Sequence, residues 1–170
     1  SDSEKCKSIT YISEFTGLPV STVHRILQEM VASGLVIKEG SEKKYKLGFE
    51  AMSLAMRIKS TNYLVDISMR EMIRLNDLSN ETIHLIAIDN QLGIYIGKLD
   101  AKNQIGLRSR VGKRIPLYCT GGGKVLLAYQ TPQWIEEYLA NTERTCFTEN
   151  TIVSEEALKE ELATIRAQGY

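Results

Sequence analysis

The first apolar positions of the chain recur at helical spacing and are followed by a turn. A short helix is predicted over residues 9–15, where the apolar positions are Ile9, Ile12 and Phe15. Gly17 and Pro19 then interrupt the pattern, because glycine tolerates turn geometry and proline cannot continue a helix. We therefore expect a tight turn between two helices.

A second amphipathic helix is predicted to begin at Ser21, as its N-cap, and to end near Ser33, with Gly34 as its C-cap. Its buried stripe would consist of Val23, Ile26, Leu27 and Met30. Its opposite face is polar and carries Ser21, Thr22, His24, Arg25 and Gln28.

The polar side chains of this second helix suit DNA. Hydroxyl groups and free N–H groups at a helix start can contact phosphate, Arg25 can pair with guanine, and Gln28 can pair with adenine. An ordinary amphipathic helix with a solvated face would show the same pattern. The helix by itself leaves both interpretations open.

Two short strand-like runs follow, Leu35–Lys38 and Lys44–Leu47, separated by the turn-forming residues 39–43. They predict a β-hairpin with Lys43 and Lys44 near its tip. On bound DNA, these two lysines would lie over phosphate or the minor groove. The order of helix, turn, helix and hairpin is that of a winged helix-turn-helix, and it favours DNA binding.

The rest of the chain predicts a linker helix and an α/β (α+β) second domain. We expect a winged helix at 1–48, a linker helix at 49–61 and a second domain at 62–170. The elements expected in the second domain are a helix over Leu64–Leu78, strands at Glu81–Asp89, Leu92–Asp100 and Gln104–Val111, and helices at Lys124–Tyr129, Pro132–Ala140 and Ser154–Gln168.

Composition narrows the class of protein. Apolar residues make up 43% of the chain, and 21 basic residues balance 21 acidic ones, so charge excess alone does not drive DNA binding. Three scattered cysteines and two histidines make a zinc site or a disulfide framework improbable, and we expect no cofactor. No secretory segment or membrane-spanning run is present, so we expect a cytoplasmic protein.

A glycine run in the second half is the main candidate for a small-molecule site. Thr120, Gly121, Gly122 and Gly123 precede the helix expected at Lys124, so free N–H groups there would suit a carboxylate. The alternative is a turn needed only for close packing. We do not expect a nucleotide-binding P-loop. Tyr118 stands where that motif has its first glycine, and Val125 stands where it has Ser or Thr.

Other side chains are candidates for the same small-molecule site. His84 lies in an alternating strand and either faces the pocket or has a structural role. Arg108 and Arg110 either reach a carboxylate or carry surface charge. Cys119 with His84 would resemble a thiol nucleophile and base, but no acid partner accompanies them, so we do not expect an enzyme.

Two sets of motifs resemble the isocitrate-lyase-regulator (IclR) family of bacterial transcription factors. The first is Leu18–Leu27 with Gly34-Leu35-Val36 and Tyr45–Gly48. The second is Glu81–Leu85, Arg110–Arg114 with Pro116-Leu117-Tyr118, and Gly123–Ala128. The resemblance covers about residues 8–170.

This resemblance implies a dimeric or tetrameric regulator that binds double-stranded operator DNA and a small organic acid. It implies a GAF-like effector-binding domain whose pocket is lined by the glycine run with Cys119. Glu81–Lys98 and Arg110–Ala128 look most similar to repressors of sugar-acid (2-keto-3-deoxygluconate) catabolism. Effector domains of the family continue past the position of Tyr170, so we expect this one to be partial. A second half that serves only oligomerisation is the alternative.

Overall fold

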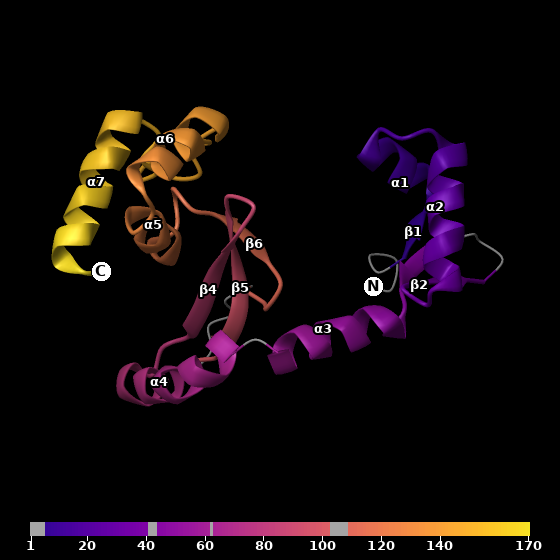
Figure 1. Ribbon diagram of the computed structural model, residues 1–170, viewed down its shortest axis with the longest axis horizontal. Coiled ribbons are helices and arrows are strands. Elements are labelled where there is room, and N and C mark those ends of the chain that lie inside the picture. Colours follow the sequence, from indigo (N-terminus) through magenta and orange to yellow (C-terminus); the bar gives the residue numbers. More distant parts are fainter. Residues whose placement is uncertain (1–5, 41–43, 62, 103–108) are drawn as a thin grey trace. The chain divides into compact units, whose positions relative to one another are not determined.

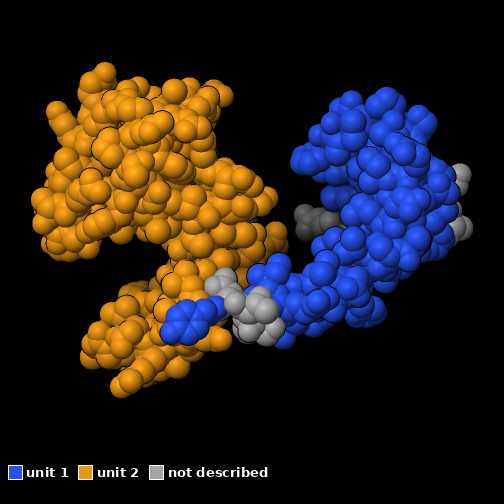
Figure 2. Space-filling model, viewed as in Figure 1, with its two compact units in different colours: residues 1–63 blue, residues 64–170 orange. Residues whose placement is uncertain are grey.

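The computed structural model describes residues 6–40, 44–61, 63–102 and 109–170 (Figure 1). The chain divides into two compact units, residues 1–63 and 64–170 (Figure 2). Each unit buries its own cluster of apolar side chains. The mixed α/β class expected from the sequence is confirmed. None of the helices in these ranges is long and apolar enough to cross a membrane.

The first unit is a helix-turn-helix followed by a hairpin. Its helices are α1 (Ile9–Thr16), α2 (Val20–Ala32) and α3 (Phe49–Thr61). Its strands are β1 (Lys7–Ser8), β2 (Val36–Glu39) and β3 (Lys44–Leu47), in the antiparallel order β1-β3-β2. Gly17, at a φ of +68°, ends α1 in the left-handed region that favours glycine.

The core of the first unit joins α2 to the hairpin. Its buried members are Val23, Leu27, Val36 and Tyr45, with Ile9, Ile12 and Met30 packed against them. Ile26, which was expected in the buried stripe, is 42% exposed. At 100° per residue it lies at the edge of the stripe centred on Val23 and Leu27, so the core covers it only in part.

The start of α2 differs from the prediction. The helix begins at Val20 with Pro19 in the N-cap position, and no side chain caps it. The Pro19 carbonyl accepts the first helical hydrogen bond, from the Val23 N–H. Proline favours a helix start because its fixed φ suits the first turn and it lacks an N–H. Ser21 therefore lies inside the first turn instead of capping it.

Two glycines hold the end of α2 against the start of α3. The C-cap of α2 is Ser33, one residue before the predicted Gly34; Gly34 follows it at a φ of +76° and donates to the Val31 carbonyl. The Gly48 N–H donates to the Leu35 carbonyl, and a Cβ at Gly48 would lie 2.0 Å from the Gly34 carbonyl oxygen. Only glycine fits this approach of backbone to backbone.

In its described residues, the second unit combines a three-stranded sheet with four helices. The sheet contains β4 (Ile83–Asp89), β5 (Leu92–Leu99) and β6 (Arg114–Pro116), in the antiparallel order β4-β5-β6. The helices are α4 (Tyr63–Ser79), α5 (Gly121–Ala128), α6 (Pro132–Asn141) and α7 (Glu155–Gln168). Figure 1 shows α5, α6 and α7 grouped together, apart from α4. Their buried core includes Leu117, Leu127, Tyr138, Leu158 and Leu162.

Some details of this unit differ from the sequence prediction or add to it. The strand expected at Gln104–Val111 lies mostly outside the described residues; its last part, residues 109–111, forms no strand, and a strand that was not predicted, β6, lies at Arg114–Pro116. The glycines at 121–123 form the first turn of α5 instead of preceding it. On α4, Met72 is buried whereas Ile67, Ile73, Leu75 and Leu78 are exposed, because apolar residues occupy more than one face of that helix.

The two faces of the sheet meet different helices. Leu85 and its cross-strand partner Gly97 lie beside Met72 of α4, whereas the next residue, Ile86, lies beside Gly122 of α5. Side chains alternate between the faces of a strand, so His84 shares the α5 face with Ile86. This placement puts His84 and the glycine run on the same side of the sheet.

Candidate nucleic-acid interface and effector-facing sheet

The polar face of α2 is exposed in the first unit. Ser21, His24, Arg25 and Gln28 are exposed, and Thr22 is half-buried. Within the described ranges, neither Arg25 nor Gln28 makes a hydrogen bond or ion pair with another side chain. Long polar side chains that have no partner within the protein are available to base edges and phosphates.

Glu29 also belongs to this exposed face, although it was not among the residues predicted to bind DNA. It lies four residues after Arg25, so helical spacing places the two side chains beside each other. A carboxylate can accept a hydrogen bond from the amino group of cytosine but repels phosphate. The exposed polar face of α2 therefore has one position that disfavours contact with the DNA backbone.

The hairpin supplies a second group of polar side chains. Lys44 begins β3 and is half-buried, whereas Lys43 lies outside the described residues. Lys38 of β2 is the cross-strand partner of Tyr45, so both point to the same face of the sheet. Sequence patterns alone do not reveal this pair, because the cross-strand partner of each residue depends on the register of the strands.

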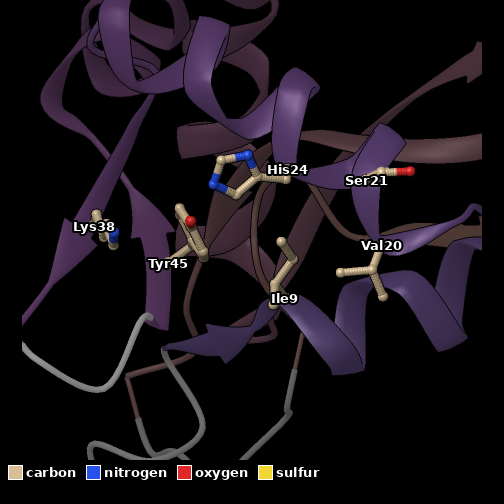
Figure 3. A pocket seen from close by; sticks show the side chains of 6 residues that line it. All are labelled: Ile9, Val20, Ser21, His24, Lys38 and Tyr45. Atoms are coloured by element: carbon tan, nitrogen blue, oxygen red, sulfur yellow. The ribbon is translucent and has the colours of Figure 1, made fainter.

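A hollow of about 600 Å³ separates the start of α2 from the hairpin. It is lined by Ile9, Val20, Ser21, His24, Lys38 and Tyr45. Figure 3 shows His24, Lys38 and Tyr45 around this hollow, from α2, β2 and β3, while the Ser21 hydroxyl points away from them. Of the predicted DNA-binding residues, Ser21 and His24 therefore line this hollow, one helical turn apart on α2.

In the second unit, His84 belongs to a hydrogen-bonded cluster on β4 and β5. Its Nε2 atom lies 2.7 Å from the Ser109 hydroxyl, and its ring lies 4.5 Å from that of Tyr95. The Lys98 ammonium donates to the Ser109 carbonyl at 2.9 Å and pairs with Asp100 at 2.6 Å. Burial, followed by the nearby Lys98 charge, lowers the pKa of His84 below its usual 6.5.

The glycine run has two roles that differ along its length. A Cβ at Gly122 would lie 2.5 Å from Ile86 Cδ1, and one at Gly123 would lie 2.5 Å from the Leu117 carbonyl oxygen. A Cβ at Gly121 would meet nothing within 4 Å. Gly122 and Gly123 therefore allow close packing of α5, whereas Gly121 leaves the start of the helix open.

Thr120 and Cys119 precede the glycine run and are half-buried. Thr120 occupies the N-cap position of α5, but its hydroxyl donates to the Pro116 carbonyl instead of capping the helix. Burial raises the pKa of the Cys119 thiol, which keeps it protonated and weakens it as a nucleophile. No hydrogen bond joins Cys119 to His84 in the ranges described.

The remaining candidates do not gather at this site. Arg108 lies outside the described residues, and Arg110 is exposed. Among the residues whose placement is described, no three His, Cys, Asp or Glu side chains group as metal ligands would. The face shared by α5 and the sheet instead offers the hydroxyl, imidazole and ammonium groups of Tyr95, His84 and Lys98.

Two family descriptions match the sequence in the same order as its two units. The IclR helix-turn-helix domain matches residues 3–40, and the C-terminal domain of the bacterial transcriptional regulator IclR matches residues 57–170. The chain belongs to the IclR family. The family resemblance drawn from the motifs is confirmed.

Relatives with known names are regulators or repressors of transcription. The HTH-type transcriptional regulator KdgR of Escherichia coli is 41% identical over 165 residues, which are 95% of this chain and 62% of that protein. KdgR of Dickeya chrysanthemi is 39% identical over 95% of this chain and 53% of its own length. The chain thus spans little more than half the length of these relatives.

Solved structures of IclR proteins share the fold. The IclR protein of Thermotoga maritima is 30% identical, with a TM-score of 0.70 over 97% of this chain and 66% of that one. An IclR homologue from Microbacterium hydrocarbonoxydans, complexed with 4-hydroxybenzoate, is 25% identical, with a TM-score of 0.77 over 97% and 68% of the two chains. The expected helix-turn-helix and C-terminal domain are confirmed at the level of the fold.

Proposed function

We propose that this chain is a cytoplasmic, DNA-binding transcriptional regulator of the repressor type. Residues 1–48 form its winged helix, 49–61 its linker helix and 62–170 its effector-binding domain. The observation that carries the proposal is the exposed polar face of α2, where Arg25 and Gln28 make no side-chain contacts of their own in the described ranges. Such a face next to a hairpin suits a DNA major groove. The names of the relatives support the same function.

The effector-binding role rests on the face of the sheet beside α5. An organic acid there would place its carboxylate near the first N–H groups of α5, at Gly121, and its polar end near His84. The Microbacterium homologue binds a small aromatic acid, and the motif resemblance favours a sugar acid for this chain. We propose an organic acid of this size as the effector.

A homodimer or homotetramer is the proposed assembly. Phe49, Met52 and Met56 of α3, and Leu64, Ile67 and Leu78 of α4, leave large apolar surfaces exposed. Exposed apolar surface of this kind marks an association site. The same observation supports the alternative that residues 62–170 serve oligomerisation without a ligand.

The DNA-binding proposal is tested with Arg25→Ala. The chain is first used to select a preferred duplex from a random pool. Loss of a bidentate contact to guanine is then expected to cost about 1–3 kcal/mol on that duplex, and much less on random-sequence duplex of equal length. Fluorescence anisotropy at fixed salt measures both. Arg70→Ala, an exposed arginine on α4, is the matched control. Equal losses on both duplexes would restrict Arg25 to phosphate contact.

The effector proposal is tested by thermal shift with sugar acids and 4-hydroxybenzoate. At roughly 100 times its Kd, a bound acid stabilises the chain by about 2.7 kcal/mol. Gly121→Val fills open space at the start of α5 without a clash and is expected to abolish the shift. Gln133→Val, on the exposed surface of α6, is the control and keeps it. A chain that no acid stabilises would favour the oligomerisation alternative. Gly122→Val would be a poorer test, because it also disturbs packing on Ile86.

A further inference from the structure

The hollow between α2 and the hairpin is lined by polar side chains that have no hydrogen-bond partner among the described residues. Tyr45 is only 7% exposed and belongs to the core of the first unit, yet its hydroxyl makes no hydrogen bond in the described ranges. No fully buried polar atom is left unsatisfied there, so this hydroxyl reaches the hollow that Tyr45 lines. A polar group in this position normally has a partner, from the protein, from water or from a ligand.

Two further donors face the same hollow. His24 comes from α2, and Lys38 comes from β2 as the cross-strand partner of Tyr45 (Figure 3). Neither side chain makes a hydrogen bond or ion pair with another described residue. Three side chains from three different elements therefore present hydrogen-bond donors to one space, and tertiary packing fixes the place of each.

The electrostatics of the hollow favour an anion. Its lining includes one lysine and no carboxylate. Glu39, the acidic residue next to Lys38, projects to the other face of the hairpin, where it accepts hydrogen bonds from Cys6 and Lys46. The negative charge of Glu39 is thus compensated away from the hollow.

We propose that this hollow holds one backbone phosphate of duplex DNA, with Tyr45 as a phosphate ligand alongside Lys38 and His24. The inference rests on the proposed DNA-binding function and adds the residue contacts. With Arg25 and Gln28 reading the major groove, the sugar-phosphate strand at the edge of that groove passes between the helix and the hairpin. The Tyr45 hydroxyl and the Lys38 ammonium then donate to its oxygens, and the site reads no sequence.

The test compares Tyr45→Phe and Lys38→Gln with the unaltered chain on the selected duplex and on random-sequence duplex, over a range of salt. Tyr45→Phe keeps the buried ring and is expected to weaken binding to both duplexes by about tenfold, with an unchanged salt slope. Lys38→Gln is expected to weaken both and to reduce the slope of log K against log salt by about 0.9. The thermal midpoint of Tyr45→Phe should not fall, because the Tyr45 hydroxyl makes no hydrogen bond with any described residue.

Lys46→Gln is the matched control, because it removes the same charge from the same hairpin on its other face, where Lys46 pairs with Glu39. It should leave the salt slope unchanged. Binding by Tyr45→Phe equal to that of the unaltered chain would overturn the proposal, as would a loss confined to the selected duplex, or an equal change of slope in Lys46→Gln. An unaltered chain that binds neither duplex would instead overturn the DNA-binding function itself.

Discussion

At the residue scale, His84 shows how neighbours set the protonation of a side chain. Its ring is half-buried, lies against Tyr95 and contacts the Ser109 hydroxyl, while Lys98 stands on the adjacent strand. Burial and the lysine charge both disfavour the imidazolium form, and their effect outweighs that of the more exposed Asp100. His84 is therefore held neutral at a pH where a histidine in an unfolded chain begins to take up a proton.

This lowered pKa predicts a loss of stability in mild acid. Below about pH 6.5 the unfolded chain binds more protons than the folded one, so the free energy of unfolding falls until the pH passes the folded pKa, and then levels off. Urea denaturation from about pH 7 to about pH 5 measures the effect. His84→Gln should flatten this fall, because it removes the group whose pKa is lowered on folding. Equal pH profiles for His84→Gln and the unaltered chain would refute the assignment.

At the element scale, the hairpin of β4 and β5 depends on a strained two-residue turn. Asn90 and Gln91 have φ values of +48° and +64°, as a hairpin turn with both central residues in the left-handed region requires. Asparagine adopts this region at modest cost, whereas glutamine does so rarely. The strands are held in register despite this cost by the pairing of β4 with β5.

Gln91→Gly is expected to raise the free energy of unfolding of the second unit by about 1 kcal/mol, because glycine removes the left-handed penalty. Urea denaturation followed by circular dichroism measures it. Asn90→Gly is the matched control and should gain less. A destabilised Gln91→Gly would mean that the glutamine side chain contributes to the hairpin in some other way.

At the scale of the whole molecule, two separate clusters of buried side chains stabilise the two units. Tyr45 and Leu27 belong to the core of the first unit, and Leu158 and Tyr138 to that of the second. The two clusters share no residue. Mutations in one core are therefore expected to act on one unit, since distant sites without shared partners contribute independently to stability.

Leu27→Ala is expected to destabilise the first unit by about 2–5 kcal/mol and to leave the second unchanged. Leu158→Ala, at a fully buried position of α7, should do the reverse. Hydrogen exchange followed by mass spectrometry resolves the two units. Equal loss of protection in both units from either substitution would show that the cores are coupled.

Much of the fold follows from local sequence signals. Helical spacing predicted α1, α2 and α7, and the strand-like runs Glu81–Asp89 and Leu92–Asp100 predicted β4 and β5. The strand β6 was not predicted, because it has only three residues and its pairing with β5 is visible only in the folded sheet. Apolar residues on several faces of α4 likewise concealed which face packs on the sheet.

The sequence by itself determined the order of elements, the family and the polar face of α2, because these depend on spacing within single helices and hairpins. Tertiary structure decided which side chains meet. The pairing of Lys38 with Tyr45 depends on strand register, and their approach to His24 depends on how α2 packs on the hairpin. Tertiary structure also decided that Gly121 faces open space whereas Gly122 and Gly123 are closely packed. Spacing along the chain does not encode this difference.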